Sequence, residues 1–231
     1  RWPSALRVLP VEWLRAQTLR TPHAALLTLA RVLEVHDVRF TGERLAAVLG
    51  RQELAGLTEL DLETCRVGER GARAILEATH LEHLERLDLD STHLRNDALL
   101  MLTRCEHLSG VREVDLSYSH FSRPEDALSL ARAPWLAGVC VLRLRHCSIP
   151  EPALEALLDA PQMLGVTHLD LAGTPFSTRL ARKLASAPWL ADLVHLDLSF
   201  TAIGSAGEDA LRRSSFVTEP VLLGMDDWVS A

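Results

Sequence analysis

The 231-residue chain repeats a short apolar pattern every 27 or 28 residues. Each copy has apolar residues at positions 1, 4, 6 and 11 and a small polar residue or cysteine at position 9. Six copies begin at Leu57, Leu84, Val111, Val139, Val166 and Leu193. A fixed period of this length predicts a solenoid, in which each unit buries its apolar face against its neighbours.

Each unit is predicted to form a strand, a turn, a helix and a return loop. Alternation such as Leu60-Asp61-Leu62 indicates a short strand with one buried face, and the residues that follow have helical spacing. Pro134, Pro161 and Pro188 end three of the helices, because proline cannot continue a helix. Since each connection passes through a helix, the strands must be parallel. Helices are wider than the strand spacing, so we expect the stack to curve.

The six segments resemble leucine-rich repeats, in particular the longer ribonuclease-inhibitor-like type with a full helix in each unit. The resemblance covers Leu57 to about Ser214. It implies an α/β solenoid shaped as a horseshoe or arc, with a parallel sheet on the concave face and helices on the convex face. It also implies a rigid scaffold that binds other macromolecules, usually proteins. Position 9 departs from the family, which often has Asn or Cys there, because four of the six units have Thr or Ser.

We expect one continuous domain with atypical ends. Residues 1–56 are interpreted as degenerate capping repeats, 57–214 as the six repeats and 215–231 as a C-terminal cap, because terminal units have one face in water. An unrelated helical segment over residues 1–29 is the alternative. Trp2, Trp13 and Trp228 are expected to pack within the caps.

Composition excludes several classes of function. A net charge of −7 argues against nucleic-acid binding, and no apolar run approaches the roughly 18 residues of a membrane helix. The first residues lack the apolar segment and cleavage pattern of a signal peptide. We therefore expect a cytoplasmic protein. Lys183 is the only lysine, which is typical of a GC-rich bacterial genome.

The four cysteines form no CxxC pair, which is consistent with a reducing compartment. Cys65 and Cys147 occupy position 9, where small polar groups are expected to hydrogen-bond backbone that has left the sheet.

Positions 3, 5 and 7 of each strand are predicted to face away from the helices, and acidic residues outnumber arginines there. Two interpretations remain open. The face is a landing site for a basic partner, or the acids only keep an exposed sheet soluble. Under the first, reversing Asp88 and Asp115 to Arg should abolish binding without lowering thermal stability. The candidate partner-binding residues are Glu59, Asp61, Glu63, Arg86, Asp88, Asp90, Glu113, Asp115, Arg143, Arg145, His168, Asp170, His195 and Asp197.

The fourth unit departs from this pattern, since Arg143 stands where the other units have Asp. Together with Arg145 it marks either a specific contact or a charge pair of Arg143 with Asp115 and Asp170 on the flanking strands.

His168 and His195, with Asp170 and Asp197, are residues that zinc can bind. Flat strand spacing does not bring four ligands to one point, so we expect no metal and no cofactor.

Four aromatic residues are candidate contacts at the rim. Trp135 and Trp189 occupy the same place two repeats apart. They are interpreted either as anchors of an interface or as side chains that cover the joint between repeats. Tyr118 and Phe200 share position 8, near the end of the strand face.

The expected function is a protein-interaction scaffold, monomeric and without catalysis, that binds a basic partner surface. No catalytic constellation and no Gly-rich phosphate loop occurs in the pattern. One alternative is a regulator of a partner enzyme, of the GTPase-activating kind, acting through Arg66, Arg95 or Arg123. Another is an internal sensor domain of a larger bacterial protein.

Overall fold

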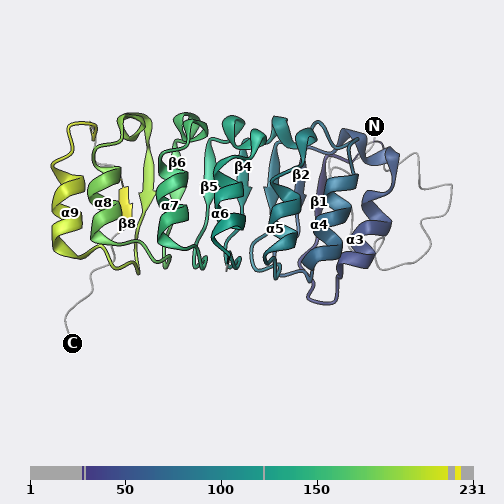
Figure 1. Cartoon of the computed structure of the whole chain (residues 1–231). Helices are drawn as coiled ribbons and strands as arrows, with labels where there is room; N and C mark the ends of the chain where they lie inside the picture. The colour runs from purple at the N-terminus through teal and green to yellow at the C-terminus, as the bar shows by residue number, and fades with distance from the viewer. Residues whose placement is uncertain (1–27, 29, 122, 218–221, 225–231) are drawn as a thin grey trace.

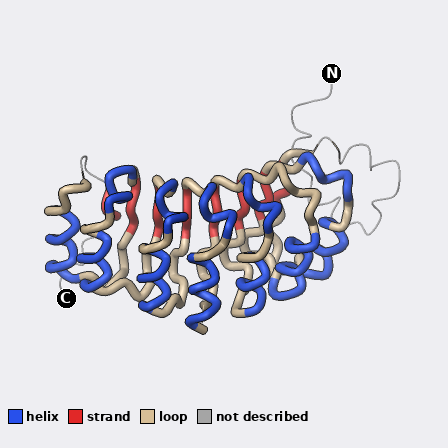
Figure 2. Tube along the Cα trace, turned by 45° about the horizontal axis from the view of Figure 1, so that its top comes forward, coloured by secondary structure: helices blue, strands red, loops and turns tan. Residues whose placement is uncertain are grey.

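The computed structural model describes residues 28, 30–121, 123–217 and 222–224. They form an α/β solenoid of leucine-rich-repeat architecture. One layer is a parallel sheet and the other is a row of helices, as Figures 1 and 2 show. The fold class predicted from the repeat is therefore confirmed. No helix in the described ranges is both long enough and apolar enough to cross a membrane.

The described part of the chain has one sheet of eight strands, which lie in space in their order along the sequence. Consecutive strands pair in parallel, and equal positions of the repeat lie side by side, so that Leu60 pairs with Leu87. The strands are β1 (Val32–Glu34), β2 (Glu59–Asp61), β3 (Arg86–Asp88), β4 (Glu113–Asp115), β5 (Val141–Arg143), β6 (His168–Asp170), β7 (His195–Asp197) and β8 (Leu222–Gly224).

A helix follows each strand from β1 to β7. The α-helices are α3 (Gly42–Leu49), α4 (Gly68–Glu77), α5 (Asp97–Leu102), α6 (Pro124–Ala131), α7 (Glu151–Leu158), α8 (Thr178–Leu184) and α9 (Gly204–Arg212). Short 3-10 helices lead back to most strands. They are η3 (Gln52–Gly56), η4 (Glu106–Gly110), η5 (Pro134–Gly138), η6 (Pro161–Gly165) and η7 (Pro188–Asp192). The three prolines predicted to end helices stand at the first residues of η5, η6 and η7.

The core lies between the two layers and is continuous along the stack. Positions 1, 4, 6 and 11 supply it. Leu60 and Leu62 of the first full unit are completely buried, as are Phe121 and Phe176 at position 11 of two later units. Burying a side chain of this size stabilises the fold by about 1.5–3 kcal/mol. Because every unit repeats these contacts, the stack is held by neighbour-to-neighbour burial.

Position 9 satisfies backbone carbonyls near the strand ends, as predicted. The Thr92 and Thr174 hydroxyls each donate to the carbonyl three residues earlier, at 2.6 Å. The Cys65 and Cys147 thiols donate instead to a carbonyl of the preceding unit, at 2.8 and 3.2 Å. Burial raises the pKa of the Cys65 thiol to about 11 and that of Cys147 to about 12, which keeps both protonated as donors. All four cysteines are free.

Trp135 and Trp189 are buried, with exposed fractions of 2% and 6%. Each indole N–H donates to the carbonyl at the end of a helix in the preceding unit, Leu102 at 2.8 Å and Leu158 at 3.1 Å. The last carbonyls of a helix have no partner within the helix, so the indole satisfies one of them. The interpretation as rim anchors is therefore wrong, and the alternative, that these side chains cover the joint between repeats, is confirmed.

Both ends of the described chain continue the register of the repeats. Leu33 in β1 pairs with Leu60, and Leu223 in β8 pairs with Leu196. The expectations for Trp2, Trp13 and Trp228 lie outside the described residues, as does nearly all of the helical segment considered over residues 1–29. The division into caps and six repeats stays a prediction.

Replacing Trp135 with Ala should lower the free energy of unfolding by about 3–5 kcal/mol, because the change leaves a cavity and an unpaired carbonyl at the joint. Urea unfolding followed by circular dichroism measures this. Trp135→Phe keeps most of the volume and should cost about 1 kcal/mol, the value of the lost hydrogen bond. Equal stability of Trp135→Ala and the parent chain would contradict the assignment.

Candidate functional site

We use the term sheet face for the surface made by positions 3, 5 and 7 of strands β1–β7 and the residues directly after them. Its row of aspartates is less accessible than alternation predicts. Asp88, Asp115 and Asp170 at position 5 are only 7–8% exposed. These carboxylates therefore lie within the face and do not project from it.

Each aspartate at position 5 accepts a backbone hydrogen bond at the end of its strand. Its Oδ1 accepts the backbone N–H of the residue two positions later, which the strand ladder no longer serves. The N–O distances are 3.2 Å for Asp61, 3.0 Å for Asp88, 2.8 Å for Asp115, 3.0 Å for Asp170 and 2.9 Å for Asp197. The repeated aspartate thus has a structural role that explains its recurrence.

This geometry revises the expectation that Asp88 and Asp115 tolerate reversal to Arg. Reversal would remove an acceptor from a buried amide and place a long cation where a short carboxylate is enclosed. Loss of partner binding in such a variant could then come from a damaged fold.

In the fourth unit, the backbone N–H two residues after position 5 has a different acceptor. Position 5 is Arg143, whose side chain cannot accept a hydrogen bond. The N–H of Arg145 donates instead to Oγ of Ser117 in the preceding unit, at 3.1 Å. Ser117 is fully buried, and its hydroxyl also hydrogen-bonds to Asp115. Sequence reasoning missed Ser117. A signal was available in the sequence. Among the six repeats, only the fourth lacks aspartate at position 5, and the third unit, directly before it, has a serine at position 7.

Arginines on the sheet face pair with nearby carboxylates. Arg143 pairs with Glu113, and not with Asp115 or Asp170 as one interpretation expected. Arg145 pairs in the other direction along the stack, with its Nη1 3.2 Å from Asp170 and 3.9 Å from Asp197.

Arg86 lies among three carboxylates. Its Nη2 is 3.1 Å from Asp88 and 4.0 Å from Asp61, and its Nε is 3.6 Å from Glu113. The face is therefore an interleaved charge network and not a uniform acidic wall.

His168 and His195 lie on adjacent strands with ring centroids 6.1 Å apart. With Asp170 and Asp197 they do not converge as metal ligands. Within the described ranges, one group of three does converge, and it lies at the other end of the face: His36, Asp61 and Glu63.

An edge of exposed aromatic rings borders the sheet face where the chain turns after each strand. Tyr118 and Phe200 are 47% and 52% exposed. His146 stacks on Tyr118 with centroids 5.0 Å apart and lies 6.4 Å from Phe200. We call Tyr118, His146 and Phe200 the aromatic ledge. All three have positive φ, between 49° and 59°, as do the other residues described at this position of the repeat.

Gly173 makes the gap in the ledge between His146 and Phe200. A Cβ at Gly173 would lie 2.2 Å from Nδ1 of His146, so the imidazole occupies the space that a side chain there would fill. Sequence reasoning singled out Tyr118 and Phe200 but missed His146, which shares position 8 with them.

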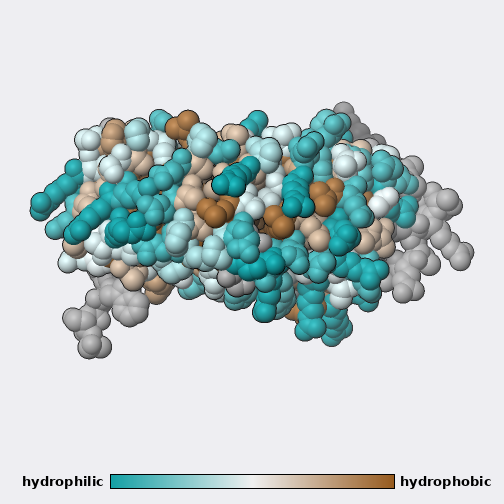
Figure 3. Space-filling view, in the orientation of Figure 1, coloured by the Kyte–Doolittle hydropathy of each residue, from teal (hydrophilic) through white to brown (hydrophobic). Residues whose placement is uncertain are grey.

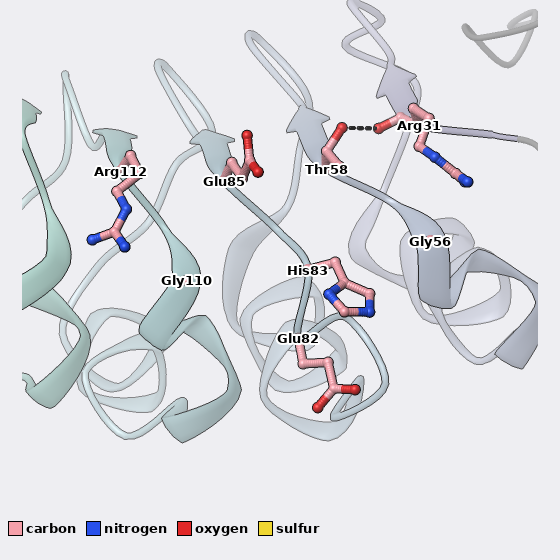
Figure 4. Close-up of a pocket in the computed structure, with 8 residues that line it drawn as sticks. All are labelled: Arg31, Gly56, Thr58, Glu82, His83, Glu85, Gly110 and Arg112. Carbon is pink, nitrogen blue, oxygen red and sulfur yellow. Dashed lines mark hydrogen bonds between the residues drawn. The ribbon is translucent and has the colours of Figure 1, made fainter.

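Two open pockets lie at opposite ends of the strands, one after the strands and one before them. One, of about 700 Å³, lies beside the ledge and is lined by Ile149, Pro150, Pro175 and Phe200 among others. The other, of about 680 Å³, lies among the return loops (Figure 4) and has charged groups of both signs, including Arg31, Glu85 and Arg112. In this second pocket the Thr58 hydroxyl donates to the Arg31 carbonyl, and Arg112 donates to that of Gly138, so several groups already have partners.

The helix face differs from the sheet face. Figure 3, which views the molecule from the helix side, shows a largely hydrophilic surface with isolated apolar residues. Neighbouring helices are linked there by ion pairs, such as Arg179 with Glu155 at 2.9 Å and Lys183 with Asp159 at 2.7 Å.

Asp115→Asn should make stability less dependent on pH. Burial, opposed by the Ser117 hydrogen bonds and reinforced by nearby carboxylates, raises the pKa of Asp115 to about 6. The folded chain then holds a proton that the unfolded chain has lost, so stability falls as pH rises from about 4 to 6. The variant keeps an acceptor oxygen. Its free energy of unfolding should exceed that of the parent chain by on the order of 2 kcal/mol at pH 7 and should equal it at pH 4. Urea unfolding at both pH values tests this, with Glu77→Gln, at an exposed position of α4, as the control for net charge. An unchanged pH profile would contradict it.

Ser117→Ala should cost about 1–3 kcal/mol, because the buried N–H of Arg145 loses its acceptor. In an Arg143→Asp background the new carboxylate can accept that N–H, so the cost of Ser117→Ala should be smaller. A double-mutant cycle on unfolding free energies measures the coupling. Equal costs in the two backgrounds would show that the serine does not replace the aspartate.

No known protein-family profile matches the chain, and no curated protein matches it in sequence. Among solved structures it is similar to an internalin of Listeria monocytogenes, with 14% sequence identity and a TM-score of 0.44. That match covers 90% of this chain and 64% of the internalin, so the chain spans less than two thirds of its length. What this chain binds has to be argued from its own residues.

Proposed function

We propose that the chain is a protein-interaction module that binds a basic partner protein across its sheet face, with the aromatic ledge as the apolar anchor. The observation that carries this proposal is the ledge itself. Tyr118 and Phe200 are two large rings left about half exposed, on backbone with positive φ. The positive φ is shared by this position of the six repeats, but the exposed rings are not, and aromatic side chains are enriched among the residues that dominate binding.

The charge of the sheet face supports a basic partner. Asp61, Asp88 and Asp115 are direct neighbours on adjacent strands, where like charges repel. Glu59 and Asp90 stand beside them, half-buried, and the described residues show no ion pair for either. Cations from a partner would offset the charges of Glu59 and Asp90, and the net charge of −7 would steer a basic protein toward the module.

The helix face is the weaker candidate. Charged groups of α7 and α8 are already paired between these neighbouring helices, and such exposed ion pairs contribute little free energy. The ledge, in contrast, stacks aromatic rings beside a pocket whose lining includes Ile149, Pro150 and Pro175.

The proposal is one of binding and not of catalysis. We further propose that the module works in a reducing compartment such as the bacterial cytoplasm, which is supported by the protonated, hydrogen-bonded Cys65 and Cys147 thiols. The interpretation as a regulator acting through arginine gains no specific observation. Arg66 and Arg95 are exposed near the strand ends, but Arg123 pairs with Asp97.

Capture experiments with three matched baits test the proposal. The chain, a Glu59→Arg/Asp90→Arg variant and a Tyr118→Ala/Phe200→Ala variant are each incubated with lysate of the source organism. Bound proteins are identified by mass spectrometry. We expect the parent chain to capture a basic protein that neither variant captures. The arginine variant reverses the charge at two acidic positions of the sheet face, and the alanine variant removes the two exposed rings of the aromatic ledge.

The control is Glu77→Arg/Glu125→Arg, which changes net charge equally but on exposed positions of α4 and α6. It should capture the same protein as the parent chain. Capture that both sheet-face variants retain, or that the helix-face control loses, would overturn the assignment of the sheet face.

A further inference from the structure

Three potential metal ligands converge at the N-terminal end of the sheet face. His36 lies two residues after β1, Asp61 is the last residue of β2, and Glu63 follows two residues later. His36 Nε2 is 2.9 Å from Asp61 Oδ1 and 3.9 Å from Glu63 Oε2. One ligand atom from each residue lies within 4.8 Å of the others, an arrangement found once among the residues that the structure describes.

We propose that His36, Asp61 and Glu63 bind a divalent transition-metal ion, with Zn²⁺ as the first choice. The donor set is one imidazole nitrogen and two carboxylates, which suits zinc and similar ions. Calcium and magnesium prefer oxygen ligands throughout, so the histidine argues against them. Water would complete the coordination, since His36 is 41% exposed and Glu63 is 46% exposed on their side chains.

A fourth residue occupies the place of an orienting group. Glu34 Oε1 lies 3.8 Å from Nδ1 of His36, while Nε2 faces the other two carboxylates. Histidine ligands of metals commonly donate their second ring N–H to a carboxylate, which sets the tautomer and the ring orientation. Glu34 is therefore the candidate positioning residue for His36, since a small approach from 3.8 Å would let it accept the Nδ1 N–H.

The backbone holds the cluster in place. Glu34 and Asp61 pair across β1 and β2, and the Val35 N–H donates to the Asp61 carbonyl at 2.9 Å. The Asp61 carboxylate is also fixed by the Glu63 N–H at 3.2 Å. Asp61 is thus a paired strand residue and His36 follows a residue bonded to its carbonyl, which limits the rearrangement that binding requires.

Arg86 is a cation that borders the site. Its Nη2 approaches Asp61 Oδ2 at 4.0 Å, whereas His36 faces Oδ1 of the same carboxylate. The guanidinium therefore does not compete for Oδ1, which accepts the Glu63 N–H and hydrogen-bonds to His36, but it opposes a second positive charge nearby. Removing that charge should tighten metal binding, a result that simple loss of structure would not produce.

Isothermal titration of the purified chain with ZnCl₂ tests the proposal. We expect one Zn²⁺ per chain, no binding at this site in His36→Ala, and a loss of about tenfold in affinity in Glu34→Gln, the usual effect of removing an orienting group. Arg86→Gln should bind more tightly than the parent chain. His195→Ala, at the other histidine–aspartate end of the sheet face, is the matched control and should bind as the parent does.

Cobalt provides a second readout. Co²⁺ in place of zinc should give a visible absorption spectrum that His36→Ala lacks, and Glu63→Gln repeats the test should His36→Ala fail to fold. Circular dichroism without metal checks each variant. The absence of saturable 1:1 binding at millimolar zinc, or an unchanged affinity in His36→Ala, would overturn the proposal. Neither result depends on partner capture, so the two proposals fail separately.

Discussion

The structure depends on the burial of one apolar layer between short strands and their helices, unit against unit. A strand of three residues and a helix of six to ten cannot bury their apolar sides alone, so each unit needs both neighbours. The same shortness creates a second requirement. The chain leaves the sheet after position 6, and the amides and carbonyls exposed there need other partners. Aspartate at position 5 and cysteine or threonine at position 9 provide them, while the two buried tryptophans do the same for carbonyls at helix ends.

The apolar part of this architecture could be predicted from the sequence, because burial repeats with the period of the chain. The positions of Leu60, Leu87 and Val114 along the repeat give the register of β2, β3 and β4 directly. The polar part was predicted less well. Alternation shows which face a residue such as Asp115 belongs to, but not how deeply its short side chain lies. It therefore could not show that Asp115 accepts a backbone amide and is nearly enclosed.

Contacts between units were the hardest to predict. Arg143 and Arg145 have long side chains, and their choice of Glu113 and Asp170 depends on rotamers that strand spacing does not specify. The cluster of His36, Asp61 and Glu63 combines positions 5 and 7 of two different units, so no single column of the repeat contains it. Likewise, His146 joins the aromatic ledge only because Gly173 lacks a side chain.

The hydrogen bond from Arg145 to Ser117 has a consequence for the evolution and engineering of this array. Units that contain their own aspartate carry the acceptor for their turn with them, so this hydrogen bond survives when such a unit is duplicated or moved. In the fourth unit it does not, because the acceptor belongs to the third. The smallest portable segment there is a pair of repeats, and a recombination event between them would leave a buried amide without a partner.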